Sequence, residues 1–160
     1  MSLLGQPYQV DVTDPEMVES TLKQTVSDLN GRLDIFVANA GVPWKQGPLL
    51  ACEIEHYKHV RSVILDGTVY CAMACGQIWK RQKETALNMT GTPLESFQSG
   101  SFIATASMSA HIVNEPRYQA PYNAAKAGVI HLCKSESCVI MDSDLTKVRS
   151  YRQVFSSGMG

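Results

Sequence analysis

Hydrophobic and polar positions in the first forty residues change from strand spacing to helical spacing and back. Tyr8–Val12 alternates apolar and polar side chains and predicts a short strand that ends near Asp11. Thr13-Asp-Pro-Glu16 is a capping-box pattern that predicts the start of a helix, and Asn30-Gly31 predicts its end. Between them, four apolar residues keep helical spacing: Val18, Leu22, Val26 and Leu29. Leu33–Ala38 is then a nearly continuous apolar run, typical of a strand buried on both faces, and the three elements form a βαβ unit.

The rest of the chain predicts a long helix, a third strand and a further helix. The long helix spans about Ile54–Lys83. Its predicted inward stripe consists of Tyr57, Val60, Ile64, Leu65, Thr68, Val69, Ala72 and Met73. Polar residues with Gly91 and Pro93 make Glu84–Gly100 a surface loop, and Ser101–Ala106 is the third strand. Small and apolar residues in Ala120–Ser135 predict a largely buried helix.

Composition and charge narrow the classes of function. The 160 residues suit one domain with a real core, and 44% hydrophobic with 18% charged residues indicates a globular chain. A net charge of −1 without a Lys/Arg cluster argues against a nucleic-acid partner, and no apolar run is long enough to span a membrane. The five cysteines form no Cys-x-x-Cys pair and no metal set, so we expect reduced, packed thiols, no metal site and a cytoplasmic location.

Tyr122 and Lys126 are the first candidate catalytic residues. Positions four apart on a helix share a face, so the phenol and the ammonium are expected to lie side by side. A neighbouring ammonium favours the phenolate form of a tyrosine, which makes it a workable proton donor or acceptor. Taken alone, this spacing is more often an ordinary pair of neighbours on a helix surface.

Three predicted strands end in residues suited to ligand binding: Asp11, Asn39-Ala40-Gly41 and Ser107. If the strands are parallel, these ends line one edge of the sheet, where ligands bind in open α/β folds. Ala40 and Gly41 allow a flat ligand to approach closely, although the tripeptide alone also fits a plain strand-to-loop turn. His111 and Asn114, in the loop before Tyr122, are candidate substrate contacts or solvated loop residues.

The order Asp-Val, Asn-Ala-Gly, Ser and Tyr-x-x-x-Lys resembles the short-chain dehydrogenase/reductase family. The sequences of three segments resemble those of the fungal branch of this family that acts on polyols and ketoses: Ile35–Gly41, Ala104–Ser109 and Tyr122–Gly128. This branch includes mannitol dehydrogenases, L-xylulose reductases and sorbose reductases. The resemblance covers about Tyr8–Ser135. It implies a Rossmann-like, doubly wound parallel sheet in three α/β/α layers. It also implies an NADP-dependent oxidoreductase, with NAD as the alternative, that interconverts a polyol and its ketone and forms a homo-oligomer if folded.

The resemblance also implies roles for matching residues. Tyr122 would exchange a proton with the substrate oxygen during hydride transfer, and Lys126 would support the phenolate and hold the nicotinamide ribose. Ser107 would orient the same substrate oxygen, with Ser109 a less favoured candidate. The remaining cofactor-binding positions would be Asp11 and Val12 near the adenine and Asn39, Ala40 and Gly41 near the middle of the cofactor.

Three departures from the family pattern lead to an alternative function. No glycine-rich turn precedes Asp11, so the first strand and the phosphate-binding turn are expected to be missing. Ile64 stands where the family carries an Asn and its polyol branch an Asp, and the resemblance stops after Ser135. We therefore expect a partial domain at 1–135 and a divergent tail at 136–160, truncated at both ends. The alternative function is a catalytically inactive fragment that associates with intact relatives.

Overall fold

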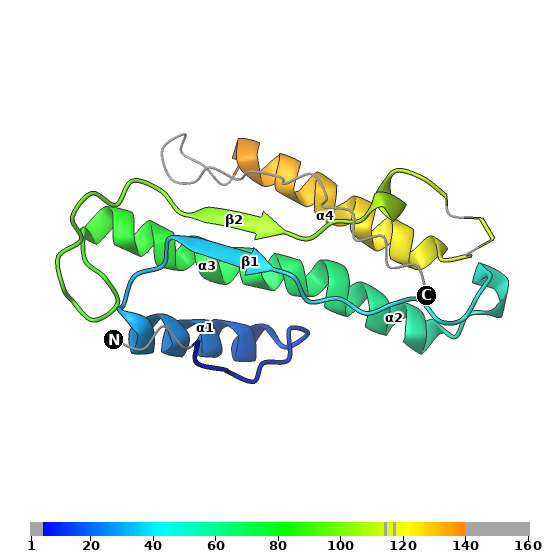
Figure 1. The fold of residues 1–160 in the computed structure, drawn as a ribbon, viewed down its shortest axis with the longest axis horizontal. Helices are drawn as coiled ribbons and strands as arrows, with labels where there is room; N and C mark the ends of the chain where they lie inside the picture. The colour runs from blue at the N-terminus through cyan, green and yellow to red at the C-terminus, as the bar shows by residue number, and fades with distance from the viewer. Residues whose placement is uncertain (1–4, 114, 117, 140–160) are drawn as a thin grey trace.

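The computed structural model describes residues 5–113, 115–116 and 118–139 of the chain (Figure 1). Two parallel strands lie against one long helical arm, with a further helix on either side of that arm (Figure 1). The elements are α1 (Pro15–Leu29), β1 (Ile35–Ala38), η1 (Leu49–Ala51), α2 (Ile54–Arg61), η2 (Ser62–Asp66), α3 (Gly67–Thr85), β2 (Ser101–Ala104), η3 (Met108–Ala110) and α4 (Ala120–Val139). The predicted α/β class is confirmed.

Helix α1 begins and ends where the sequence predicts. Asp14 is the N-cap, because its carboxylate accepts hydrogen bonds from the backbone N–H groups of Glu16 and Met17. At the other end, the N–H of Gly31 donates to the carbonyl of Val26 at 2.7 Å, and Gly31 adopts a positive φ of 76°. The buried face consists of Val18, Leu22 and Val26. This face packs against α3.

The sheet contains two parallel strands, with Ile35 opposite Ser101 and Ala38 opposite Ala104. One face of the sheet carries Phe36, Ala38, Phe102 and Ala104, which pack into the core. On the other face Ile35 is 62% and Val37 is 55% exposed, so the described helices cover one side of the sheet. The second helical layer of the expected three-layer fold is not formed by the described residues.

The predicted strand at Tyr8–Val12 is not a strand in the structure. Its alternation of polar and apolar side chains suits a half-buried strand, but a strand also needs a neighbour to satisfy its backbone groups. Within the described residues β1 pairs only with β2, so Tyr8–Val12 has no strand to pair with. The third predicted strand is present and is two residues shorter than expected, at Ser101–Ala104.

The predicted long helix is present as α2, η2 and α3 in succession, and its middle five residues form a π-helical turn. Arg61 and Asp66 form an ion pair of 3.1 Å across that turn. A π-turn contains more residues than an α-turn, so the inward face shifts along the sequence beyond it. Met73, predicted to face inward, is accordingly 56% exposed. The buried positions of α3 are Gly67, Thr68, Cys71, Ala74, Cys75, Ile78, Trp79 and Gln82.

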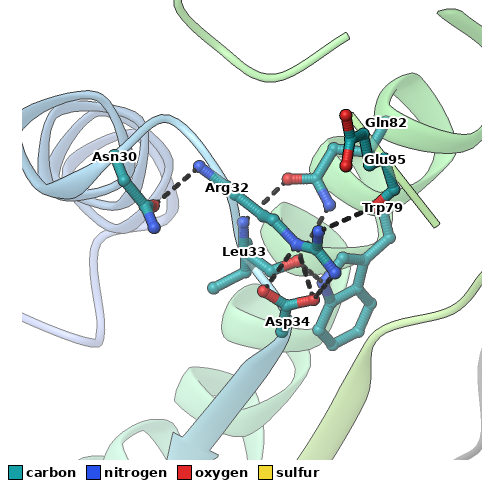
Figure 2. A network of polar contacts seen from close by, with 7 residues as sticks. All are labelled: Asn30, Arg32, Leu33, Asp34, Trp79, Gln82 and Glu95. Carbon is teal, nitrogen blue, oxygen red and sulfur yellow. Dashed lines mark hydrogen bonds and ion pairs between the residues drawn. The ribbon is translucent and has the colours of Figure 1, made fainter. Parts of the chain in front are cut away.

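A buried hydrogen-bond network attaches the start of β1 to α3 (Figure 2). The side chain of Gln82 accepts from the N–H of Leu33 and donates to its carbonyl, both at 2.8 Å. The indole N–H of Trp79 donates to the same carbonyl at 3.0 Å. Arg32 forms a bidentate pair with Asp34 on the exposed side of this network. The entry of the chain into the sheet is therefore held by both backbone groups of one residue.

Candidate active site

The carboxyl ends of β1 and β2 meet at one edge of the sheet, as predicted for parallel strands. The N–H of Thr105, just after β2, donates to the carbonyl of Ala38 at 3.0 Å. The hydroxyl of Thr105 donates to the side-chain oxygen of Asn39 at 2.8 Å. These two bonds hold Asn39, Ala40 and Gly41 beside the end of β2, where a ligand can approach the sheet edge.

Lys126 of α4 reaches this edge of the sheet. Its ammonium donates to the carbonyl of Thr105 at 2.6 Å, and the residue is only 5% exposed. A Cβ atom built on Gly41 would lie 3.9 Å from the Lys126 nitrogen, so the Asn39–Gly41 turn lies directly beside the ammonium. Burial lowers the pKa of Lys126 because desolvation penalises the charged form. Within the described residues Lys126 forms no ion pair, so its charge is available to an anionic group.

Tyr122 and Lys126 lie on the same cleft, one turn apart on α4. The cleft has a volume of about 440 Å³ and opens at the ends of the two strands. Its walls are formed by Asn39, Gly41, Val42, Pro43, Trp44, Thr105, Ala106, Ser109, Gln119, Tyr122 and Lys126. The cleft thus brings a phenol, an ammonium and a serine hydroxyl together beside the Asn39–Gly41 turn.

The two candidate serines differ in position. Ser107 begins η3, and its hydroxyl oxygen accepts a hydrogen bond of 3.2 Å from the N–H of Ser109. Ser109 is 7% exposed, and its hydroxyl oxygen accepts a hydrogen bond of 2.9 Å from the side-chain amide of Gln119. Of the two serines, Ser109 is the one that lines the cleft, and Ser107 stays a prediction that rests on the family pattern.

Asp11, Val12 and Ala40 line a second hollow of about 600 Å³. The carboxylate of Asp11 accepts hydrogen bonds from the N–H and the hydroxyl of Thr13, at 2.9 and 2.8 Å. These bonds lower the pKa of Asp11, because they stabilise its charged form. The structure therefore divides the predicted cofactor-binding residues into two groups, and Ala40, which lines the second hollow, stands in the sequence between Asn39 and Gly41 of the cleft.

The described residues fit one end of a nicotinamide cofactor and not its phosphates. The Lys126 ammonium, which forms no ion pair within the described residues, and the space beside Gly41 suit a ribose and a flat ring. The N-terminus of α1, however, is already capped by the carboxylate of Asp14 and followed by Glu16, so it repels an anion. No step that depends on the pyrophosphate follows from these residues.

Ile64 lies in the core, so the side chain at this position is apolar and buried. It is 1% exposed within the π-helical turn, and its carbonyl accepts the Thr68 hydroxyl at 2.7 Å. The apolar side chain packs in the same hydrophobic cluster as Val60 and Val129. A side chain that could hold a water molecule is therefore absent at residue 64.

Sequence reasoning missed Thr105, Gln119 and Trp44 as residues of the cleft. Thr105 was detectable, because it lies at the carboxyl end of the predicted strand Ser101–Ala106, whereas Gln119 and Trp44 lie in loops without a signal. The Trp44 indole donates to the carbonyl of Gly47 at 2.7 Å. The predicted contact residue His111 is exposed and does not line the cleft, and Asn114 lies outside the described residues.

The described residues contain neither a metal-binding cluster nor a membrane-spanning helix. No group of three or more His, Cys, Asp or Glu side chains there could hold a metal ion. None of the described helices combines the length and apolar character needed to cross a bilayer.

Comparison with known proteins identifies relatives of this chain. A family model described as enoyl-(acyl carrier protein) reductase matches residues 2–142. An L-xylulose reductase of Hypocrea jecorina is 48% identical over 80% of the chain and 44% of its own length. A probable NADP-dependent mannitol dehydrogenase of Yarrowia lipolytica is 44% identical over 82% of the chain and 42% of its own length. The chain therefore spans less than half the length of these relatives.

Solved structures support the same assignment. The NADPH-dependent 3-quinuclidinone reductase of Rhodotorula rubra matches with a TM-score of 0.73 and 34% identity, over 89% of this chain and 48% of that one. A short-chain type dehydrogenase/reductase of Mycobacterium marinum matches with a TM-score of 0.69 and 30% identity, over 82% of this chain and 45% of that one. With a family match across most of its length and this cleft at the strand ends, the chain belongs to the short-chain dehydrogenase/reductase family.

Proposed function

We propose that this chain carries the proton-transfer part of an NADP-dependent oxidoreductase that interconverts a small polyol and its ketose. The observation that carries the proposal is the cleft shared by Tyr122, Lys126 and a serine hydroxyl at the ends of β1 and β2. The relatives named for L-xylulose and for mannitol supply the substrate class. The mannitol dehydrogenase relative, which is named as NADP-dependent, favours NADP over NAD.

The cleft supports the roles proposed for Tyr122 and Lys126, which both line it, and the role of Ser107 rests on the family pattern. Tyr122 donates a proton to the substrate oxygen in reduction and accepts one in oxidation. The Lys126 ammonium stabilises negative charge on that phenol, because burial strengthens its electrostatic effect. Ser107, with Ser109 as the alternative, donates a hydrogen bond that orients the substrate oxygen. NADPH supplies the hydride when it is bound.

Asn39–Gly41 would contact the middle of the cofactor, and Asp11 and Val12 would lie towards its adenine. The small side chains at Ala40 and Gly41 leave the room that such a contact needs. The hollow beside Asp11 and Val12 is separate from the cleft. Binding of the whole cofactor therefore depends on residues that bridge the two.

Titration of the purified chain with NADPH tests the cofactor, with the fluorescence of Trp44 in the cleft wall as the signal. Turnover of fructose, L-xylulose and sorbose tests the reaction. Tyr122→Phe should abolish turnover and leave NADPH binding intact, whereas Tyr118→Phe, at a 60% exposed position, should change neither. Ser107→Ala and Ser109→Ala then identify the serine, since only the substrate-binding one should lower kcat strongly. Equal turnover in wild type and Tyr122→Phe would exclude the proposed mechanism.

A second candidate function is association without catalysis. It is favoured by the buried Ile64 and by the exposed apolar face of the sheet at Ile35 and Val37. In this case the chain binds a partner polypeptide, and we expect neither saturable NADPH binding nor turnover. The titration described above distinguishes the two functions.

A further inference from the structure

Gln119 connects the start of α4 to η3 inside the cleft. It directly precedes α4, and its carbonyl accepts a helical hydrogen bond from the N–H of Asn123 at 3.0 Å. Its side-chain amide donates to the hydroxyl oxygen of Ser109 at 2.9 Å. Gln119, Ser109 and Tyr122 all line the cleft. One side chain therefore fixes the serine hydroxyl of η3 relative to the helix that carries the phenol.

The hydrogen bond between Gln119 and Ser109 is shielded from water. Ser109 is 7% exposed, and Gln119 is half-buried. The turn η3 also packs against α4, so the two ends of the bond are held by elements that contact each other. A hydrogen bond in such surroundings is electrostatically stronger than one in water. The fold, rather than exchange with solvent, therefore sets its geometry.

The direction of this hydrogen bond decides where the Ser109 hydroxyl points. An amide N–H can only donate, so it occupies a lone pair of the serine oxygen and excludes the hydroxyl hydrogen from the direction of Gln119. A hydroxyl that accepts one hydrogen bond is also a stronger donor, because hydrogen bonds in a chain polarise one another. Both effects favour donation from Ser109 to an acceptor within the cleft, such as the oxygen of a carbonyl group.

Ser107 supports the backbone of the same turn. Its hydroxyl oxygen accepts from the N–H of Ser109 at 3.2 Å and caps η3. Ser107 does not line the cleft. Ser107 therefore helps to place the backbone of Ser109, whereas Gln119 contacts its hydroxyl.

We propose that Gln119 is a positioning residue, which orients the Ser109 hydroxyl towards the oxygen of a bound ketone or secondary alcohol. The proposal rests on the proposed oxidoreductase function and takes Ser109 as its substrate-binding serine. Gln119 acts through Ser109 and transfers no proton itself. During reduction, negative charge develops on the substrate oxygen, which then receives the proton of Tyr122. A hydrogen bond aimed at that oxygen is stronger in the transition state than in the ground state, so Gln119 should affect kcat more than KM.

Two variants of similar side-chain length test the direction of the bond. Gln119→Met removes the donor and should lower kcat about three- to tenfold, while KM changes less than about twofold. Gln119→Glu is only an acceptor when ionised, so it reverses the bond and turns the hydroxyl hydrogen away from the substrate. It should lower kcat further than Gln119→Met does. Gln98→Met, at an exposed loop position, is the matched control and should have the kcat of wild type.

A double-mutant cycle separates positioning from a purely structural role. In a Ser109→Ala background there is no hydroxyl to orient, so Gln119→Met should change kcat by less than about twofold. If Gln119 only stabilised the start of α4, the loss of kcat would be the same in both backgrounds.

NMR spectroscopy of the chain labelled with isotopic glutamine gives a readout that does not depend on turnover. The side-chain amide signal of Gln119 is assigned by its absence in Gln119→Met. This signal should shift in Ser109→Ala, whereas the signal of Gln98 should keep its position. The comparison also decides the case in which Ser109→Ala turns over too slowly to measure.

Three results would overturn this proposal while Tyr122-dependent turnover stays intact. They are an unchanged kcat in Gln119→Met, equal losses of kcat in the wild-type and Ser109→Ala backgrounds, and a Gln119 amide signal that Ser109→Ala does not shift. Wild-type kcat in Gln119→Glu would show that the bond runs in the opposite direction and would overturn it as well. Absence of turnover in wild type, or turnover that survives Tyr122→Phe, would instead overturn the proposed function and this proposal with it.

Discussion

Replacing Gln82 by leucine should destabilise the chain by removing both hydrogen bonds to Leu33. Gln82 is 1% exposed and Leu33 is 8% exposed, so water cannot replace the lost side chain. Within the described part of the chain the Leu33 N–H bonds to Gln82 alone, so it becomes a buried unsatisfied donor, at a cost of about 1–3 kcal/mol. The Leu33 carbonyl still accepts a hydrogen bond from Trp79. Loss of its hydrogen bond from Gln82 therefore adds only about 0.5–1.5 kcal/mol. We expect a total loss of about 1.5–4.5 kcal/mol, a large part of the roughly 5–15 kcal/mol typical of a domain.

The assay is urea unfolding followed by far-UV circular dichroism, with Gln77→Leu as the matched control. Gln77 lies on the same helix with an exposed side chain, and its replacement should change stability by less than about 0.5 kcal/mol. Trp79→Phe removes the second donor to the Leu33 carbonyl, so the double variant leaves that carbonyl without a partner. The double variant should therefore be less stable than the sum of the two single effects, by about 0.5 kcal/mol or more.

Two results would refute this account of the network. One is a Gln82→Leu variant within about 0.5 kcal/mol of wild type at an unchanged denaturant slope. The other is strict additivity of the Gln82 and Trp79 variants, which would show that the two donors do not share the carbonyl in solution. Because the network lies immediately before β1, its loss should also loosen the strand whose far end carries the Asn39–Gly41 turn.

Three further predictions follow from the site and from α1. Burial lowers the pKa of Lys126 below its usual 10.5, so the unfolded chain binds that proton more tightly, and stability should rise with pH towards 10.5. In Lys126→Met this rise, measured by urea unfolding between pH 7 and 10, should be lost, and an unchanged slope would contradict it. Gly31→Ala places a Cβ atom at a φ of 76° and 2.8 Å from the Asn88 side chain, and should cost more than about 1 kcal/mol; a neutral thermal melt would disprove the strain. Asp14→Ala should cost about 1 kcal/mol through loss of the α1 cap, and Asp14→Asn should restore most of it in the same melt.

Local signals in the sequence predicted the elements and the positions of residues that depend on one element. The start of α1 at Asp14-Pro15 and its end at Asn30-Gly31 depend on capping within a few residues, so both could be predicted from the local sequence. Tyr122 and Lys126 share a cleft because helical spacing alone brings them together. Asn39 and Thr105 meet because parallel strands end at one edge.

What the sequence could not predict depends on contacts between distant segments. The π-turn at Ser62–Asp66 shifts the inward face of α3, and the hydrophobic periodicity of the preceding residues does not predict this shift. Tyr8–Val12 has the alternation of a strand, but its conformation depends on whether a neighbouring strand exists to pair with it. Gln119 enters the cleft wall because it bonds to Ser109 across ten residues of loop, for which the sequence carries no spacing rule.

The cleft and the exposed apolar face of the sheet depend on different residues, so the two proposed functions are separable. The cleft is held by the β1–β2 pairing, by the Asn39–Thr105 bond and by Lys126 on α4. Ile35 and Val37 are more than half exposed and do not line the cleft. Association through these two residues would therefore leave Tyr122 and Lys126 in place, so association and proton transfer can be measured on one protein.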